Sequence, residues 1–441
     1  MFINKVNELN SLEEEYKKKQ ATFSVIYGRR RVGKTALITK FIENKPHIYL
    51  YITQSNLKSQ LDFFTNEIKK FVDNSVKDYL NFNSFEEAIG FLATLNLSKK
   101  LVLVIDEYQY LAMLDKSFSS KLQMLWDTKL QNSNIYLILC GSVLSMMQSE
   151  VLNYTAPLYG RRTSSFHIKP IKFNYLKEFL PKLDKETLVK VYASFGTIPK
   201  YLIEYNQNLT FMQNLEKKIL NKNSYLYNEG NFLIKDEIKD SASYFNILQS
   251  ISNGNRKIGQ IASNLGVNSS YLSKYIQKLI ELEIIEKEIP ITENNPSKSK
   301  RGLYKIKDKF LNFWFYYVYK NYSYLEIEQT KTVLQEIDKN FNDKFVSFAF
   351  EDIILEDLRQ NPKKYINFIP TKIGKWWDSK NEIDIVAFDD NNIAFIECKW
   401  QNRVNIQKVK SELIAKTSML IGKKESQFIV ITKDDFLERL Q

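Results

Sequence analysis

Residues 28–35 bring together, in one short stretch, the side chains and backbone groups that bind phosphate. Gly28-Arg29-Arg30-Arg31-Val32-Gly33-Lys34-Thr35 matches the pattern G-x-x-x-x-G-K-[ST]. The glycines allow the backbone to wrap around phosphates, and the N–H groups of the loop donate hydrogen bonds to them. Lys34 would reach the β- and γ-phosphates, and the Thr35 hydroxyl would bind Mg²⁺. The stretch therefore predicts a binding site for ATP and Mg²⁺.

Asp106 and Glu107 are the carboxylates that such a site requires. They follow the apolar run Leu101–Ile105, so we expect them at the end of a buried strand. Asp106 would hold the Mg²⁺ ion, and Glu107 would polarise the attacking water as a general base. Ser142 follows the next apolar run and would contact the γ-phosphate or the water. A plain turn residue is the alternative at Ser142.

A second group of charged side chains lies near the C-terminus. Asp384 and Glu397 are 13 residues apart, which is enough for a hairpin that brings the two carboxylates together. Lys399 is expected on the same face as Glu397, because side chains alternate along a strand. Asp384 and Glu397 would bind Mg²⁺, and Glu351 from an upstream helix would add a ligand. Lys399 would orient water and stabilise negative charge.

The apolar pattern predicts the elements that position these residues. In the first half, apolar runs alternate with segments of helical spacing, which favours a parallel sheet covered on both faces. After residue 171 the pattern is helical, and the aromatic run Phe310–Tyr319 is expected in the core, with stacking on nucleic-acid bases as the alternative. The last part returns to alternation, with strands predicted at Glu382–Phe388, Ile393–Lys399 and Gln427–Thr432 and a helix near Gln407–Ile421.

Residues 258–306 have the pattern of a winged helix. The second helix, Ser269–Leu282, would direct Leu272, Tyr275, Ile276, Leu279 and Ile280 inward and Ser270, Ser273, Lys274, Gln277 and Lys278 outward. Strands at Glu286–Thr292 and Leu303–Ile306 would form a wing whose tip carries Lys298, Lys300 and Arg301. Basic residues on the second helix and on the wing favour contact with DNA. Packing against another part of the protein is the alternative use of this module.

Composition limits the class of protein. The chain has 441 residues, a formal net charge of +12 and only two cysteines and two histidines. The positive charge suits a polyanionic partner, although a biased base composition of the genome would produce it equally well. Disulfide scaffolds and histidine-rich metal sites are excluded. The longest dense apolar run is too short to cross a membrane, which takes about 20 residues, so we expect a cytoplasmic protein without membrane contact.

Several of these stretches together resemble a known family. Gly28–Thr35, Val104–Glu107, Cys140–Ser142 and Pro157–Arg162 are similar to the archaeal-type AAA ATPases of prokaryotes, which are STAND-like P-loop NTPases. Phe195–Tyr201 resembles part of their helical lid, with Thr197 in place of a glycine, and Phe2–Leu12 resembles their N-terminal start, with Lys5-Val6 in place of Arg-Glu. The resemblance implies that an arginine after the sheet, here Arg161, senses the γ-phosphate in cis or in trans.

The C-terminal part resembles the nuclease-like domain that accompanies this ATPase family. Phe350-Glu351, Gly374–Trp377, Glu382–Ala387 and Glu397–Trp400 are similar to the corresponding pieces of PD-(D/E)xK nucleases. The resemblance implies phosphodiester cleavage with Glu351, Asp384, Glu397 and Lys399 as site residues. A nuclease-like fold that binds DNA without cutting it remains the alternative.

The expected architecture is α/β. It consists of a P-loop NTPase parallel sheet with a helical lid, a winged helix-turn-helix and a small α/β restriction-endonuclease-like domain. The corresponding ranges are 1–170, 171–238, 239–310 and 311–441. The predicted function is ATP hydrolysis coupled to action on DNA, with possible assembly into a homo-oligomer. A non-cleaving, ATP-gated regulator that binds DNA or a partner protein is the alternative.

Overall fold

The computed structural model describes residues 3–53, 56–238, 241–417 and 420–439. Residue contacts divide the chain into two compact units. Unit 1 comprises Met1–Tyr175 together with Ile198–Lys200, and unit 2 comprises Leu176–Thr197 and Tyr201–Gln441. Unit 2 thus contains most of the predicted lid, the predicted winged helix and the C-terminal part. The division into four domains stays a prediction.

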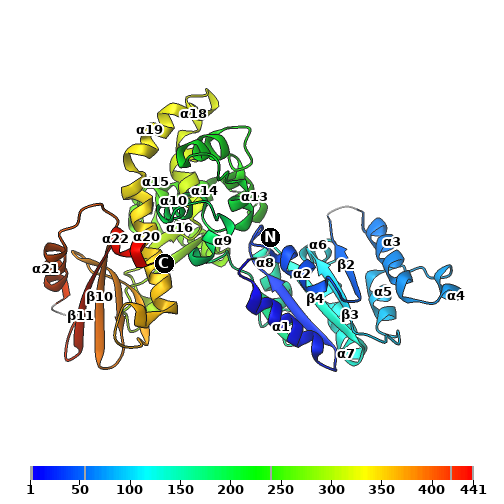
Figure 1. The fold of residues 1–441 in the computed structure, drawn as a ribbon. Helices are drawn as coiled ribbons and strands as arrows, with labels where there is room; N and C mark the ends of the chain where they lie inside the picture. Colours follow the sequence, from blue (N-terminus) through cyan, green and yellow to red (C-terminus); the bar gives the residue numbers. More distant parts are fainter. Residues whose placement is uncertain (1–2, 54–55, 239–240, 418–419, 440–441) are drawn as a thin grey trace. The chain divides into compact units, whose positions relative to one another are not determined.

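Unit 1 is built on a parallel sheet of five strands in the order β2-β3-β4-β1-β5 (Figure 1). Its strands are β1 (Thr22–Tyr27), β2 (His47–Tyr51), β3 (Leu101–Asp106), β4 (Ile135–Gly141) and β5 (Ser164–His167). The helices are α1 (Val6–Lys17), α2 (Lys34–Ile42), α3 (Leu57–Ile68), α4 (Asn74–Lys77), α5 (Phe85–Leu92), α6 (Gln109–Leu114), α7 (Phe118–Thr128) and α8 (Leu144–Met147). The predicted parallel P-loop sheet is confirmed. The short edge strand β5 was not predicted, because its sequence Ser-Ser-Phe-His has no apolar run.

Alternating side chains of the sheet enter two separate cores. On one face, Val102, Val104 and Ile138 pack with Leu12 of α1 and Leu37 of α2. On the other face, Leu103, Ile105 and Leu137 pack with residues of α3, α5, α6 and α7. Every residue of β3 and β4 is buried, which explains why these two strands are continuous apolar runs in the sequence.

Unit 2 begins with helices and continues into the winged helix. The helices of this part are α9 (Leu176–Phe179), α10 (Lys185–Phe195), α11 (Pro199–Glu204), α12 (Phe211–Asn214), α13 (Glu229–Glu237), α14 (Ala242–Ser252), α15 (Ile258–Leu265) and α16 (Ser269–Glu281). The wing is the antiparallel pair β6 (Ile285–Glu288) and β7 (Leu303–Ile306). Strand β6 is shorter than the predicted Glu286–Thr292, because Ile291 hydrogen-bonds instead to Lys375 through its backbone N–H, at 2.9 Å.

Helix α16 is amphipathic in the predicted orientation. Leu272, Ile276 and Leu279 are buried, whereas Ser270, Ser273, Lys274 and Gln277 are exposed. Tyr275, Ile280 and Lys278 are only partly buried. The polar face of α16 is therefore available to a partner.

The remaining helices of unit 2 connect the winged helix to the C-terminal sheet. They are α17 (Lys309–Phe313), α18 (Tyr322–Glu326), α19 (Thr330–Phe341) and α20 (Ser347–Gln360). The aromatic run after Lys309 is buried as predicted, with Phe310, Phe313, Trp314, Phe315 and Tyr317 each 0% exposed. Aromatic residues thus form the core between these helices rather than a surface that stacks on bases.

The C-terminal part of unit 2 is a mixed sheet of four strands in the order β11-β10-β9-β8 (Figure 1). Its elements are β8 (Lys372–Trp377), β9 (Glu382–Phe388), β10 (Asn392–Lys399), α21 (Ile406–Thr417), β11 (Glu425–Thr432) and α22 (Lys433–Arg439). Strands β9, β10 and β11 agree with prediction. Strand β8 was not predicted. The end of the predicted helix Gln407–Ile421 includes residues 418–419, which lie outside the described residues.

Within the described ranges, no helix has both the length and the apolar character that a membrane span requires.

Candidate functional site

The phosphate loop connects β1 to α2 at the carboxyl edge of the parallel sheet. Gly28 has a φ of 148°, and a Cβ atom there would lie 2.3 Å from the carbonyl oxygen of Ile168, so only glycine fits. Gly33 has a φ of 97° and precedes the first turn of α2. The free N–H groups of that turn point toward the loop, which is the geometry of an anion site.

Lys34 lies at the centre of this loop. Its Nζ donates hydrogen bonds to the carbonyl oxygens of Gly28 at 2.8 Å and of Arg29 at 3.0 Å. The side chain is buried, and burial lowers the pKa of Lys34. An ammonium group held against backbone carbonyls in a polar loop is well placed to exchange these contacts for phosphate oxygens.

The carboxylate of Asp106 accepts hydrogen bonds from three residues. Its Oδ2 accepts hydrogen bonds from the Thr35 hydroxyl at 3.4 Å and from the hydroxyl of Tyr49. Its Oδ1 accepts from the backbone N–H of Glu107 at 2.9 Å. Thr35 and Asp106, the two predicted Mg²⁺ ligands, are thus adjacent and fit that ion. Tyr49 was missed because it lies on another strand with no motif of its own.

Glu107 is held on the other side of the loop. Its carboxylate accepts hydrogen bonds from the Ser142 hydroxyl at 2.7 Å and from the side-chain amide of Gln109. The same Gln109 amide reaches the Ser142 oxygen at 3.4 Å. The structure therefore brings Ser142 to Glu107, at the edge where a γ-phosphate and its attacking water would lie. Gln109 has no signal in the sequence beyond its proximity to Glu107.

The three arginines of the loop have different surroundings. Arg30 donates a hydrogen bond to the hydroxyl of Tyr110 at 2.9 Å, so the Arg30 side chain points toward the segment after β3. Arg31 has a φ of 70°, and Val32 is fully buried and anchors the loop in the core. Arg29 contributes its carbonyl oxygen to Lys34, as described above.

Arg161 does not lie beside the phosphate loop of its own chain. Thr163, two residues later, bonds through its backbone N–H to Phe23 at the start of β1, whereas the loop follows the end of that strand. Six residues of strand separate the two edges by about 15 Å or more. The Arg161 guanidinium instead pairs with Asp127, at 3.0 Å. The γ-phosphate contact in cis is thus incompatible with this structure, and a contact in trans stays a prediction.

The C-terminal carboxylates meet on β9 and β10. The two strands pair up to Ile385 and Ile396, and Asp384 and Glu397 are the next residues on each. The Oδ2 of Asp384 accepts a hydrogen bond from the backbone N–H of Cys398 at 2.7 Å. Burial, together with the charges of Glu351 and Glu397, raises the pKa of Asp384 to about 8.

Two lysines contact Glu397. Lys399 donates to its Oε1 at 2.9 Å, and Lys416 of α21 lies 3.5 Å from the same atom. The other oxygen, Oε2, is buried and has no hydrogen-bond partner in the described structure. Such an atom next to a second carboxylate suits a Mg²⁺ ion, which is usually bound by one or two carboxylates and several waters. Lys416 was missed because no spacing rule links it to Glu397.

Glu351 is bound by a lysine, and its charge also acts on Asp384. Its Oε2 forms a buried ion pair with Lys375 of β8, at 2.6 Å. In the described ranges, no group of three or more Asp, Glu, His or Cys side chains is close enough to hold a metal ion together. The role of Glu351 as a third ligand stays a prediction, and it would require Glu351 to leave Lys375.

The wing of the winged helix is docked rather than free. Arg301 forms an ion pair with Glu293 at 2.9 Å, and its guanidinium donates to the carbonyl oxygen of Trp377. The indole N–H of Trp377 returns a hydrogen bond to the Arg301 carbonyl at 3.0 Å. Lys298 and Lys300 remain exposed. Of the predicted basic wing tip, only these two lysines remain available to a partner.

Comparison with known families agrees with this layout. A family model described as an ATPase domain predominantly from Archaea matches residues 2–205. A model described as a bacterial regulatory protein of the arsR family matches residues 245–287, across the winged helix. A third model, described as archaeal and bacterial proteins of unknown function, matches residues 314–412.

The fold and the phosphate loop define a P-loop ATPase domain followed by a winged-helix element. An uncharacterized protein of Methanocaldococcus jannaschii is 36% identical over 427 residues, which cover 96% of this chain and 93% of that protein. The chain belongs to the same family as that protein, and its residues 2–205 form the archaeal-type ATPase domain. The Walker-type ATPase PABY2304 of Pyrococcus abyssi has a similar fold, with a TM-score of 0.51, 20% identity and coverage of 71% of this chain and 96% of that one.

Proposed function

We propose that this protein hydrolyses ATP in unit 1 and acts on DNA through unit 2, where Asp384, Glu397 and Lys399 cleave phosphodiesters with Mg²⁺. The observation that carries the proposal is the pair of phosphate-handling sites, one in each unit. The first is the loop around Lys34, and the second is the pair of carboxylates, Asp384 and Glu397, with its two lysines.

In the ATP site, each side chain has a distinct task. The loop N–H groups and Lys34 bind the phosphates, while Thr35 and Asp106 would hold Mg²⁺, which neutralises charge on the phosphate oxygens. Glu107 accepts the proton of the attacking water, and Ser142 fixes the orientation of the Glu107 carboxylate through their 2.7 Å hydrogen bond. Hydrolysis would then change the conformation or the assembly of the protein.

In the C-terminal site, Asp384 and Glu397 would hold Mg²⁺, whose charge would stabilise the anionic transition state of phosphodiester hydrolysis. Lys399 is 2.9 Å from Glu397, so it can orient the attacking water and balance the developing negative charge. Burial, followed by the charges of Glu351 and Glu397, raises the pKa of Asp384, and a bound cation would offset each of these effects.

The test is cleavage of plasmid and branched DNA with Mg²⁺, with and without ATP, alongside ATP turnover. Asp384→Ala and Lys399→Ala should abolish cutting, and Lys408→Ala, an exposed lysine of α21, should not. Lys34→Ala should lower ATP turnover by about a hundredfold or more. Unchanged turnover in Lys34→Ala would remove the ATP site from the proposal, and cutting that survives in Asp384→Ala would remove the nuclease site.

A second function is favoured by the docked wing. Arg301 of the wing is bound to Glu293 and Trp377. Glu351 is bound to Lys375. Unit 2 therefore also fits an ATP-gated regulator that binds DNA or a protein without cutting it. DNA-stimulated ATP turnover without any nicking would identify this regulator. A homo-oligomer in the cytoplasm is compatible with either function.

A further inference from the structure

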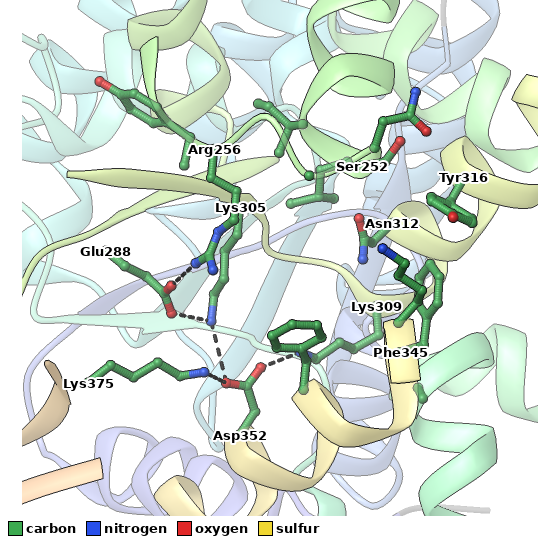
Figure 2. Close-up of a pocket in the computed structure, with 18 residues that line it drawn as sticks. Ser252, Arg256, Glu288, Lys305, Lys309, Asn312, Tyr316, Phe345, Asp352 and Lys375 are labelled. Atoms are coloured by element: carbon green, nitrogen blue, oxygen red, sulfur yellow. Dashed lines mark hydrogen bonds and ion pairs between the residues drawn. The ribbon is translucent and has the colours of Figure 1, made fainter. Parts of the chain in front are cut away.

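Unit 2 contains a cavity of about 270 Å³ that none of the proposed activities uses. It lies where α14, the wing strands, α17 and α20 meet β8, and Figure 2 shows the side chains that line it. Its size is just below the range for small-molecule sites, which is about 300–1,000 Å³, so it suits a small ligand.

The wall of the cavity carries more positive than negative charge. Its basic side chains are Arg256, Lys305, Lys309, Lys344 and Lys375, whereas Glu288 and Asp352 are its only carboxylates within the described structure. The five basic side chains thus outnumber the two carboxylates, even with both carboxylates charged.

Asp352 is shared by three of the lysines. Lys305 and Lys375 each lie 3.6 Å from its Oδ1, and Lys309 bonds to its Oδ2. Glu288 pairs with Lys305 at 2.6 Å and also with Arg256. These ion pairs run along one side of the cavity in Figure 2.

Several polar groups around the cavity are not used by this network. The Nε of Arg256 is buried without a hydrogen-bond partner among the described residues. Lys344 is exposed at the rim and forms no ion pair within the described part of the chain. In Figure 2, Asn312, Tyr316 and Phe345 lie on the side opposite the ion pairs, so an amide and two aromatic rings face the charged wall.

We propose that this cavity binds a small molecule that carries both a phosphate group and an aromatic ring, of the nucleoside monophosphate class. The phosphate would bind Lys344, whose charge no ion pair in the described structure uses, within the excess positive charge of the wall. The ring would pack against Tyr316 and Phe345. The site is separate from the phosphate loop and does not depend on ATP hydrolysis or on DNA cleavage.

The experiment measures binding of AMP to the full chain by equilibrium dialysis. The Lys34→Ala background is used so that the phosphate loop contributes little. AMP should bind, and inorganic phosphate should compete with it. Lys344→Glu and Asn312→Leu should each weaken binding about tenfold, which corresponds to about 1.4 kcal/mol. Lys339→Glu, the same charge change at an exposed position of α19 outside the cavity, should have no effect.

Two further arms complete the test. The first arm compares a tetranucleotide that carries a 5′-phosphate with the same tetranucleotide carrying a 5′-hydroxyl. Displacement of AMP by the phosphorylated form alone would show that the phosphate can come from the end of a strand. Circular dichroism of Lys344→Glu and Asn312→Leu checks that both variants fold. The proposal is overturned if AMP does not bind at millimolar concentration, or if Lys339→Glu weakens binding as much as Lys344→Glu does.

Discussion

Glu107 adopts a backbone conformation that non-glycine residues rarely use, with a φ of 55°. The conformation turns its side chain toward Ser142 and Gln109, which hold the carboxylate at the edge of the phosphate loop. A positive φ at a residue other than glycine is strained, and it persists only where the surrounding contacts hold the residue in place. Such strained residues often lie at functional positions.

Glu107→Gln should therefore separate ATP binding from ATP hydrolysis. The amide keeps the shape of the side chain but cannot accept a proton, so turnover should fall by about a hundredfold or more while ATP affinity changes little. Steady-state turnover and titration with a fluorescent ATP analogue measure the two quantities. Glu43→Gln, an exposed position at the end of α2, is the matched control. A variant that hydrolyses ATP at the normal rate would exclude Glu107 as the base.

The raised pKa of Asp384 makes a prediction about stability. In the folded chain this carboxyl keeps its proton up to about pH 8, whereas in the unfolded chain it loses it near pH 4. Between these values the folded state binds the extra proton, so its stability should fall as pH rises. Asp384→Asn removes this dependence, and the variant should become progressively more stable than the wild type from pH 5 to pH 8, by at most about 1.4 kcal/mol per pH unit.

Urea unfolding in metal-free buffer, followed by tryptophan fluorescence, measures this difference. Four of the five tryptophans, Trp314, Trp376, Trp377 and Trp400, lie in unit 2, so the signal reports on the right unit. Asp390→Asn, in the exposed turn before β10, serves as the control. Parallel pH profiles of wild type and Asp384→Asn would show that the proton is not held in the folded chain.

At the scale of elements, helix α16 and the wing differ in what they offer to DNA. Lys274 and Gln277 of α16 are exposed, whereas Arg301 of the wing is bound to β8. A recognition helix enters the major groove, and its lysines reach the phosphates on either side. If the module binds DNA, α16 should therefore contribute more to affinity than Arg301 does.

Lys274→Ala should weaken binding to double-stranded DNA several-fold and reduce the salt dependence by about one phosphate contact. Fluorescence anisotropy over a range of salt concentrations measures both effects. Lys331→Ala removes an equal charge from an exposed position of α19 and should leave affinity and salt slope unchanged. Equal effects of the two substitutions would mean that only net charge matters and that α16 is not the contact surface.

For the whole molecule, the position of Arg161 bears on assembly. Its guanidinium lies at the edge of the sheet opposite the phosphate loop and is paired with Asp127. If Arg161 does sense the γ-phosphate, the nucleotide must belong to a neighbouring copy of the chain. ATP turnover would then require an oligomer.

Mixing two inactive variants tests this arrangement. Arg161→Ala keeps its own phosphate loop, and Lys34→Ala keeps an intact Arg161, so a mixed assembly contains complete sites that neither variant has alone. Turnover should reappear on mixing and rise with protein concentration. Normal turnover in Arg161→Ala, or no recovery in the mixture, would contradict a contact in trans.

The sequence by itself determined the parts of the protein that depend on neighbours in the chain. The phosphate loop is eight consecutive residues, and the strands β3 and β4 are apolar throughout because both of their faces are buried. Asp384 and Glu397 could be paired in advance because a hairpin connects them over 13 residues. Period and spacing are local properties, so they can be read before the fold is known.

Tertiary structure alone decided the contacts between distant segments. Arg301 meets Trp377 across 76 residues of sequence, and Lys375 pairs with Glu351 across 24 residues. Tyr49 reaches Asp106 from another strand, and the cavity forms where segments between Ala193 and Lys375 converge. Such contacts depend on how whole elements pack against each other, and no periodicity along the chain records that packing.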